Sequence, residues 1–294
     1  MRDARPVLAA VLLMLAAPLL AQDAPDAAII GGPSVYVVKP GDTIAAIGAR
    51  YAVDPAEIAA ANALKHNARL SAGQVLQFDN THIATRDPDA TITINVAQRL
   101  LFLRDGDRVT AYPITVGSRG WPTPRGPFTI VDKETDPTWD VPVSIQREME
   151  RQGKPVITQM PPSPANPLGK YWLRLSFSGV GIHGTNAPQS IYRFGSHGCI
   201  RMHPDDIAAV FDRVAIGTRG VSVYQPILMA VMDGRVWLEA NRDEYGLAPD
   251  RFLYVRAVAD QHGLSNSIDW AAADRVLRAL AGRAEDVTRR ETEK

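Results

Sequence analysis

Short runs of strand-forming residues, separated by glycine, proline or aspartate, fill the chain from Thr91 to Tyr224. The runs cover residues 91–96, 100–103, 109–116, 126–132, 171–177, 180–182 and 221–224. Runs of this length that are rich in β-branched and aromatic residues form strands, and the residues between them form turns. We therefore predict a mainly β domain, a sandwich or a barrel with few helices.

A smaller unit of mixed structure precedes this β region. Residues 35–38 and 70–78 predict two strands. Between them, apolar residues keep helical spacing over residues 44–51, and Asp54 followed by Pro55 begins a second helix. The order strand, helix, helix, strand predicts a separate βααβ module.

Two segments of the β region depart from the strand pattern. Residues 154–167 are rich in proline and too long for an ordinary connection, so they predict a functional loop or flap. Pro204 begins a predicted helix, because proline favours the first helical position and the two aspartates after it suit the positive end of the helix dipole. We expect this helix to end at Gly217 and to pack behind Cys199.

Residues 226–294 predict a C-terminal extension made of a hairpin and a helix. Asp233 and Gly234 separate two apolar runs, which is a strong signal for a β-hairpin. Ser267 can cap a last helix that reaches Leu280. The sequence of this extension indicates no function of its own.

The N-terminus has the layout of a secretory signal peptide. Arginines precede an apolar run over residues 7–20, and a cleavage point follows Ala21. A helix that crosses a bilayer needs about 20 apolar residues, so the run is short for that purpose. Residues 1–21 therefore predict export, with an uncleaved anchor as the alternative because Leu19 stands where a small residue is usual.

The charge of the chain is balanced. It has 32 lysines and arginines against 32 aspartates and glutamates. Such a protein has no general field that attracts nucleic acid or an anionic membrane. We expect no nucleic-acid partner, and other partners must be recognised by local sites.

Cys199 is the only cysteine in the 294 residues, and it lies in Gly195-Ser196-His197-Gly198-Cys199-Ile200-Arg201. An unpaired thiol in an oxidising compartment is exposed to oxidation or mispairing, so its presence indicates a functional role. A thiol attacks only as the thiolate, and a cysteine with a pKa of about 8.5 is only a few per cent ionised at neutral pH. It needs a base or a cation nearby.

Four neighbours of Cys199 could supply this chemistry. His197 shares a face with Cys199 if the segment is extended, and His183 ends a predicted strand that could lie alongside. Gly198 allows close approach of a substrate, and the amides of Gly198 and Cys199 could point at a developing oxyanion. Arg201 could bind a carboxylate.

The small N-terminal unit resembles a LysM module, which binds peptidoglycan and chitin. The resemblance rests on Tyr36-Val37-Val38-Lys39-Pro40-Gly41-Asp42-Thr43, Ile47, Tyr51, Asn62 and Ser71-Ala72-Gly73-Gln74-Val75-Leu76. It covers residues 34–79 and implies a βααβ fold with glycan strands as partners.

The cysteine motif resembles the active site of the L,D-transpeptidase family, the YkuD type, in which a histidine is followed at this distance by Ser/Thr-His-Gly-Cys. The resemblance covers residues 91–225 and includes Thr123-Pro124-Arg125-Gly126, Asn166-Pro167-Leu168-Gly169 and Gly181-Ile182-His183-Gly184-Thr185. It implies a β-sandwich catalytic domain with the cysteine in a cleft under a mobile loop.

When the roles of the family's residues are carried over by position, the resemblance implies that Cys199 is the nucleophile. It implies that His183 is the general base, oriented through the carbonyl of Gly184. His197, Ser196 and the amides of Gly198 and Cys199 would shape the substrate and oxyanion site. Arg201 stands where many members carry asparagine, and we assign it to substrate binding.

The resemblance also implies a reaction. The donor is a peptidoglycan tetrapeptide stem, which the thiol attacks at the diaminopimelate carbonyl with release of D-alanine. The thioester is then resolved by another stem, by a lipoprotein lysine, or by water, which would make the protein an L,D-carboxypeptidase. The place of action is the periplasm, and no residue cluster calls for a metal or a redox cofactor.

Other interpretations of these residues stay open. Cys199 could be a buried small apolar residue, and the histidines could be core residues or, with His203, metal ligands, although no paired CxxC or HxxxH is present. His203 fits a helix cap or a surface position better. Arg201 could pair with an aspartate of the following helix. A non-catalytic wall protein that binds peptidoglycan through the LysM-like unit is the alternative to an enzyme.

Overall fold

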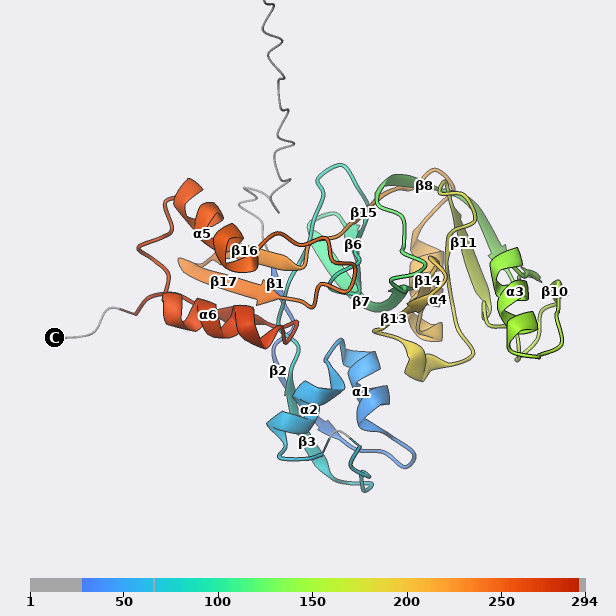
Figure 1. The fold of residues 1–294 in the computed structure, drawn as a ribbon, viewed down its shortest axis with the longest axis horizontal. Helices are drawn as coiled ribbons and strands as arrows, with labels where there is room; N and C mark the ends of the chain where they lie inside the picture. Colours follow the sequence, from blue (N-terminus) through green and yellow to red (C-terminus); the bar gives the residue numbers. More distant parts are fainter. Residues whose placement is uncertain (1–27, 66, 291–294) are drawn as a thin grey trace, which may run out of the picture.

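The computed structural model describes residues 28–65 and 67–290. The expected signal peptide, residues 1–21, lies outside this range. Figure 1 shows a β domain at the right, the small α1–α2 unit below it, and the C-terminal extension at the left. Within the described part of the chain, no helix has both the length and the apolar character to cross a membrane.

One sheet closes on itself in the β domain. Its strands are β5 (Ile92–Asn95), β6 (Leu100–Asp105), β7 (Arg108–Gly117), β8 (Gly126–Thr135), β11 (Tyr171–Leu175), β12 (Gly181–His183), β14 (Ile200–Met202) and β15 (Arg219–Val223). Around the sheet the order is β7, β14, β12, β11, β8, β15, β5, β6, and β6 pairs again with β7. The short strand β13 (Phe194–Ser196) adds to the end of β7. The domain is therefore a closed barrel.

The mainly β composition is confirmed, but the expected β-sandwich is wrong, and the reason lies in β7 and β8. Residues 108–113 of β7 pair with β6, whereas Ile114 and Thr115 pair with β14. Residues 126–129 of β8 pair with β15, and residues 130–135 pair with β11. This stagger carries the sheet round until its edges meet, and strand-forming runs in a sequence do not show it.

Aliphatic side chains fill the barrel, and α4 (Pro204–Arg213) covers it with Ile207 and Val210 in the same core. His203 is the N-cap of this helix and accepts a hydrogen bond from the backbone of Asp205, as expected of a cap. The helix ends at Arg213, earlier than predicted, and Gly217 lies in the turn that follows it.

The small N-terminal unit has the βααβ order that its sequence predicts. Its elements are β2 (Pro33–Val37), α1 (Ile44–Tyr51), α2 (Pro55–Ala61) and β3 (Val75–Asp79), and β2 pairs antiparallel with β3. Thr43 caps α1 and Asp54 caps α2. The strand β1 (Ile29–Ile30) before this unit pairs with β4 (His82–Ile83) after it.

The C-terminal extension contains more structure than its sequence predicts. The hairpin of β16 (Ile227–Met232) and β17 (Arg235–Ala240) turns at Asp233 and Gly234, both with positive φ. The strand β18 (Ala284–Asp286) adds to β17, and α6 (Trp270–Ala279) is capped by Asp269 rather than by Ser267. The helix α5 (Arg251–Gln261) was missed because it buries only Val255 and Ala259, which leaves no apolar stripe to recognise.

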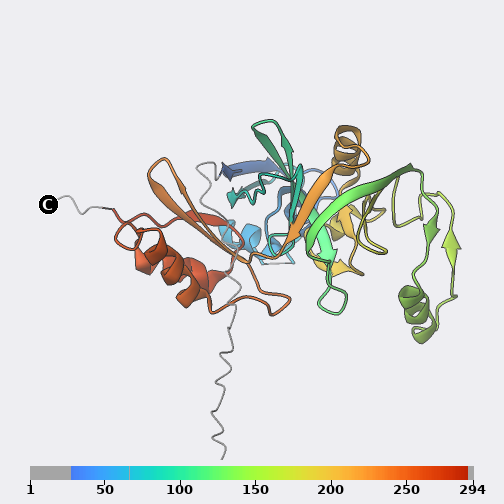
Figure 2. The same cartoon turned by 90° about the horizontal axis from the view of Figure 1, so that it is seen from above.

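A long excursion leaves the barrel between β8 and β11. It contains β9 (Trp139–Asp140), α3 (Val143–Arg151) and β10 (Gln159–Met160), and β9 pairs with β10. Figure 2 shows α3 near the tip of this excursion, away from the C-terminal extension. The flap expected over residues 154–167 is the second half of this excursion, and α3 in its first half was not predicted. The whole excursion, residues 136–170, is called the flap below. The 3₁₀ turn η1 (Pro188–Ser190) lies between β12 and β13.

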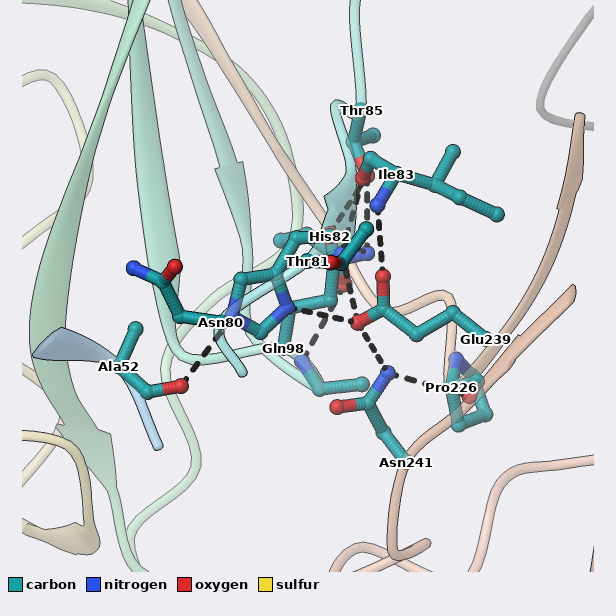
Figure 3. A network of polar contacts seen from close by, with 12 residues as sticks. Ala52, Asn80, Thr81, His82, Ile83, Thr85, Gln98, Pro226, Glu239 and Asn241 are labelled. Atoms are coloured by element: carbon teal, nitrogen blue, oxygen red, sulfur yellow. Dashed lines mark hydrogen bonds and ion pairs between the residues drawn. The ribbon is translucent and has the colours of Figure 1, made fainter. Parts of the chain in front are cut away.

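The three parts of the molecule meet at a buried polar network (Figure 3). Glu239 of the extension accepts hydrogen bonds from Ile83 N of β4, at 2.8 Å, and from Gln98 Nε2 of the barrel, at 2.9 Å. His82 lies between the Glu239 carboxylate and the carbonyl of Ala52, which follows α1. These contacts tie the extension and the N-terminal unit to the barrel.

Candidate active site

The strand register brings three of the expected residues to one face of the barrel. β12 runs parallel to β14, with Ile182 beside Ile200 and His183 beside Arg201. Both isoleucines are buried in the core, so His183 and Arg201 point to the opposite, outer face. Cys199 lies immediately before β14, two residues from Arg201, and its side chain is partly exposed. The thiol therefore opens onto the face that carries the buried imidazole.

His183 is held as a neutral base. Its Nδ1 lies 2.7 Å from the carbonyl oxygen of Gly184. A carbonyl only accepts, so Nδ1 carries the proton and Nε2 carries the lone pair. Burial, with a smaller contribution from the Arg201 guanidinium, lowers the pKa of His183 to about 3. The imidazole is therefore uncharged at neutral pH and able to accept a proton at Nε2.

The Cys199 thiol is protonated in the resting protein. Burial of the site raises its pKa above the ordinary value, and a backbone hydrogen bond at Gly181 and the nearby Arg201 oppose this only in part. Sγ lies 3.7 Å from the carbonyl oxygen of Gly179. The site thus pairs a neutral thiol with a neutral imidazole, so ionisation requires transfer of the thiol proton to a base.

The low pKa of His183 predicts a pH dependence of stability. The unfolded chain binds a proton at this residue below about pH 6.5. In the folded protein the pKa of His183 is lowered to about 3, so the proton binds only at much lower pH. The unfolding free energy therefore falls as the pH drops through this window, by about 2 kcal/mol between pH 7 and pH 5. We expect His183→Gln to lose about 2 kcal/mol less than the wild type over that step.

Urea unfolding of both proteins at pH 7 and pH 5 measures this difference. Other titrating groups contribute equally to both proteins and cancel. The same pH dependence in His183→Gln and wild type would contradict a buried, neutral His183.

A tryptophan that the sequence analysis missed covers this face. Trp172 of β11 is the register partner of His183, and the two ring centroids are 5.7 Å apart. A Cβ at Gly181 would lie 2.5 Å from the Trp172 ring, so only glycine lets the indole lie over β12. Trp172 therefore shields the imidazole from water and contributes to its low pKa. In the sequence, Trp172 has no feature that distinguishes it from an ordinary strand residue.

The turn before Cys199 is closed by Ser196. Its Oγ donates to the carbonyl of Cys199 at 2.5 Å and accepts from the amide of Gly198 at 3.2 Å. The Gly198 amide is therefore engaged within the turn, which differs from its expected place in an oxyanion site. The Cys199 amide has no hydrogen-bond partner among residues 28–65 and 67–290, so it is the donor left for a substrate.

His197 faces the flap. Gly198 has a φ of +100°, so the segment is not extended, and the rule that residues i and i+2 of a strand share a face does not apply to His197 and Cys199. Its Nε2 lies 3.0 Å from Oε2 of Glu148 on α3, and its ring centroid is 5.2 Å from that of Trp121. Glu148 and Trp121 were missed, and the contact with Glu148 spans 49 positions in the sequence.

Arg201 does not pair with the helix that follows it. Asp206 binds Arg50 of α1 instead, at 2.8 Å, and Asp205 lies 3.5 Å from His203. Arg201 has no ion pair with any residue in the described ranges, and burial lowers its pKa. A partly buried guanidinium beside the thiol suits an anionic group of a ligand.

Profiles of two known domains match this chain. A profile of the L,D-transpeptidase catalytic domain matches residues 89–224, and a LysM profile matches residues 36–79. The probable L,D-transpeptidase YbiS of Escherichia coli is 30% identical over 219 residues, which cover 72% of this chain and 71% of that protein. The chain belongs to the L,D-transpeptidase family.

Two further relatives of the L,D-transpeptidase family match over a smaller share of their length. The probable L,D-transpeptidase ErfK/SrfK of Salmonella typhimurium is 34% identical over 201 residues, 65% of this chain and 65% of that protein. Its counterpart in Escherichia coli is 37% identical over 164 residues, 52% of this chain and 53% of that protein. The chain thus spans less than two thirds of these two relatives.

Metal ligands do not gather at this transpeptidase-family site. Within residues 28–65 and 67–290, no group of three or more His, Cys, Asp or Glu side chains could hold a metal ion. His203, which could have joined His183, His197 and Cys199, caps α4 instead.

The contact between His197 and Glu148 predicts how much α3 is stabilised against local unfolding. None of the nine residues of α3, all of them described, is buried, and the Glu148 side chain is 40% exposed. An exposed contact of this kind between an imidazole and a carboxylate contributes about 0.2–1 kcal/mol. We expect Glu148→Gln to speed amide hydrogen exchange in residues 143–151 by at most about fivefold.

Hydrogen–deuterium exchange followed by mass spectrometry measures this change. Glu150→Gln is the matched control, because Glu150 lies on the same helix and is exposed. Equal exchange in the Glu148→Gln variant and wild type would show that the contact does not hold the flap.

Proposed function

We propose that this protein is an L,D-transpeptidase that acts on peptidoglycan tetrapeptide stems, with Cys199 as nucleophile and His183 as general base. The observation that supports this most strongly is the state of His183. It is a buried, neutral imidazole, its Nδ1 proton is directed to the Gly184 carbonyl, and it lies on the face that carries the thiol. Its Nε2 is the acceptor that a protonated thiol requires.

The first half-reaction forms a thioester. The thiol proton moves to His183 Nε2 as Sγ attacks the diaminopimelate carbonyl, and the oxyanion accepts a hydrogen bond from the Cys199 amide. The C–N bond to D-alanine then breaks, and His183 returns the proton to the departing amine. The products are free D-alanine and an acyl group on Sγ, so the energy of the amide bond is conserved without ATP.

The second half-reaction passes the acyl group to an amine. The acceptor nitrogen attacks the thioester carbonyl, loses a proton to His183, and releases the Cys199 thiol. A second stem peptide as acceptor gives a cross-link, a lipoprotein lysine gives an anchored protein, and water gives a carboxypeptidase. We favour an amine acceptor.

The remaining parts of the protein have supporting roles in this proposal. Ser196 and Gly198 hold the turn that presents Cys199, His197 contacts the flap, and Arg201 binds a carboxylate of the stem. Residues 34–79 bind the glycan strand, and residues 91–225 carry the catalysis. Residues 1–21 direct export to the periplasm, where the peptidoglycan lies.

The test is a reaction of the purified protein with a diaminopimelate-containing tetrapeptide muropeptide, with products identified by mass spectrometry. A cross-linked dimer and free D-alanine are the expected result. Tripeptide with D-alanine and no dimer would indicate the carboxypeptidase or a protein acceptor. The absence of any change that depends on Cys199 would overturn the proposal in favour of a non-catalytic wall-binding protein.

A further inference from the structure

The C-terminal extension reaches the active site through Tyr245. This residue lies between β17 and α5, and its hydroxyl contacts two backbone groups of the barrel loop 117–123. It accepts a hydrogen bond from the amide of Thr123 at 3.0 Å and donates one to the carbonyl of Gly117 at 2.8 Å. A single hydroxyl thus joins both ends of this loop.

Thr123 also binds the turn that contains Cys199. Its side chain is buried, and Oγ1 accepts from the amide of Gly117 at 2.8 Å. Because that contact uses a lone pair, the hydroxyl proton is available for the carbonyl of Gly198, which lies 3.0 Å away. Tyr245 and Gly198 are therefore linked through one residue.

The carbonyl of Gly198 belongs to the same peptide unit as the amide of Cys199. A trans peptide is planar, with its carbonyl and its N–H pointing in opposite directions. By holding the Gly198 carbonyl, Thr123 determines the direction of the Cys199 N–H. That N–H is the oxyanion donor in the proposed function, and a donor acts only when it is aimed within a few tenths of an ångström.

Tyr245 is itself held rigidly. Its ring stacks on Tyr224 with centroids 4.9 Å apart and an interplanar angle of 9°, and its edge meets Phe194 at 5.7 Å. The Tyr224 hydroxyl accepts from the amide of Tyr245 at 2.9 Å and donates to Asp243 at 2.8 Å. Burial raises the pKa of Tyr245, so its hydroxyl stays protonated and able to donate.

We propose that Tyr245 is a positioning residue for acyl transfer, which acts through Thr123 to aim the Cys199 amide at the oxygen of the carbonyl under attack. This inference rests on the proposed function. It gives residues 226–294 a part in the chemistry, because the extension supplies a hydroxyl that the barrel loop lacks.

Two reagents distinguish a change in the direction of the Cys199 amide from a change in the reactivity of the Cys199 thiol. A carbapenem acylates the thiol: the Sγ–C bond forms, the β-lactam C–N bond breaks, the thiol proton ends on the ring nitrogen, and an oxyanion develops on the way. Iodoacetamide alkylates the thiol by displacing iodide at a saturated carbon, without an oxyanion. Since Cys199 is the only cysteine, each reaction reports on this residue alone.

Tyr245→Phe keeps the ring and its stacking but removes the hydroxyl. We expect its carbapenem acylation rate to fall by about tenfold or more, while the iodoacetamide rate stays unchanged. With the tetrapeptide, kcat should fall by a similar factor with little change in KM. Thr123→Val removes the same link from the barrel side and should show the same pattern. Tyr254→Phe, a partly buried tyrosine of α5 in the same extension, is the matched control.

The possible outcomes test the proposed function and the role of Tyr245 separately. If iodoacetamide alkylates the wild-type protein but neither the carbapenem nor the tetrapeptide acylates it, the proposed function is overturned. A reactive wild type with equal acylation in Tyr245→Phe would overturn the role of Tyr245 alone. An equal fall in both the acylation and the alkylation rate would indicate a general disturbance of the site and would also overturn it. A thermal melt shows that each variant is folded.

Discussion

Replacing Cys199 with alanine is expected to abolish release of D-alanine and formation of cross-linked product, a loss of at least about 10⁴-fold in rate. The substitution removes the nucleophile, and a methyl group cannot form the thioester. The side chain is partly exposed and its thiol makes only weak contacts with the backbone of Gly179, at 3.7 Å, and Gly181, so stability should change by less than about 0.5 kcal/mol. Mass spectrometry of the muropeptide reaction and a thermal melt measure the two effects.

The control for this experiment is His183→Gln, which leaves the thiol in place and removes the base. It should retain the fold at pH 7 and lose about 10²–10⁴-fold in rate. Release of D-alanine by Cys199→Ala at the wild-type rate would mean that another group carries the reaction, and the proposed function would then fail.

The largest expected loss of stability follows Glu239→Ala, at about 3–5 kcal/mol. The Glu239 side chain is 0% exposed and accepts hydrogen bonds from Ile83 N, Gln98 Nε2 and Asn241 Nδ2, at 2.8, 2.9 and 3.0 Å. It also lies 3.3 Å from Nδ1 of His82 (Figure 3). Alanine leaves the amide of Ile83 buried without its acceptor and removes one of the two acceptors of Gln98 Nε2 and of Asn241 Nδ2. An unpaired buried group costs about 1–3 kcal/mol.

Equilibrium unfolding in urea measures this loss. Glu239→Gln keeps the shape and one acceptor oxygen, so its loss should be smaller than that of alanine. Glu134→Ala, at an exposed position of β8, is the surface control and should change stability by less than about 0.5 kcal/mol. Equal stability of Glu239→Ala and Glu134→Ala would show that the network does not join the three parts of the fold.

Elements with local signals were predicted well. The βααβ unit follows from helical spacing and from the caps Thr43 and Asp54, and α4 begins at Pro204 as expected. The hairpin at Asp233 and Gly234 follows from turn chemistry, because both residues adopt positive φ. In each case the residues that determine the structure lie within one turn of one another.

Elements that depend on distant partners were missed or wrong. The ends of β7 and β8 bind different neighbours and close the barrel, which replaced the expected sandwich. The flap helix and α5 bury few side chains, so their sequences carry little periodicity.

The sequence by itself determined the family, the βααβ unit, the β character of the main domain, and the candidate pair Cys199 and His183, because each depends on residue type at short spacing. Only the tertiary structure decided the closure of the barrel, the neutral state of His183, and the contacts of Glu148 and Tyr245. Those contacts join residues 49 and 122 positions apart. Their formation depends on how whole elements pack and exclude water, which no local pattern records.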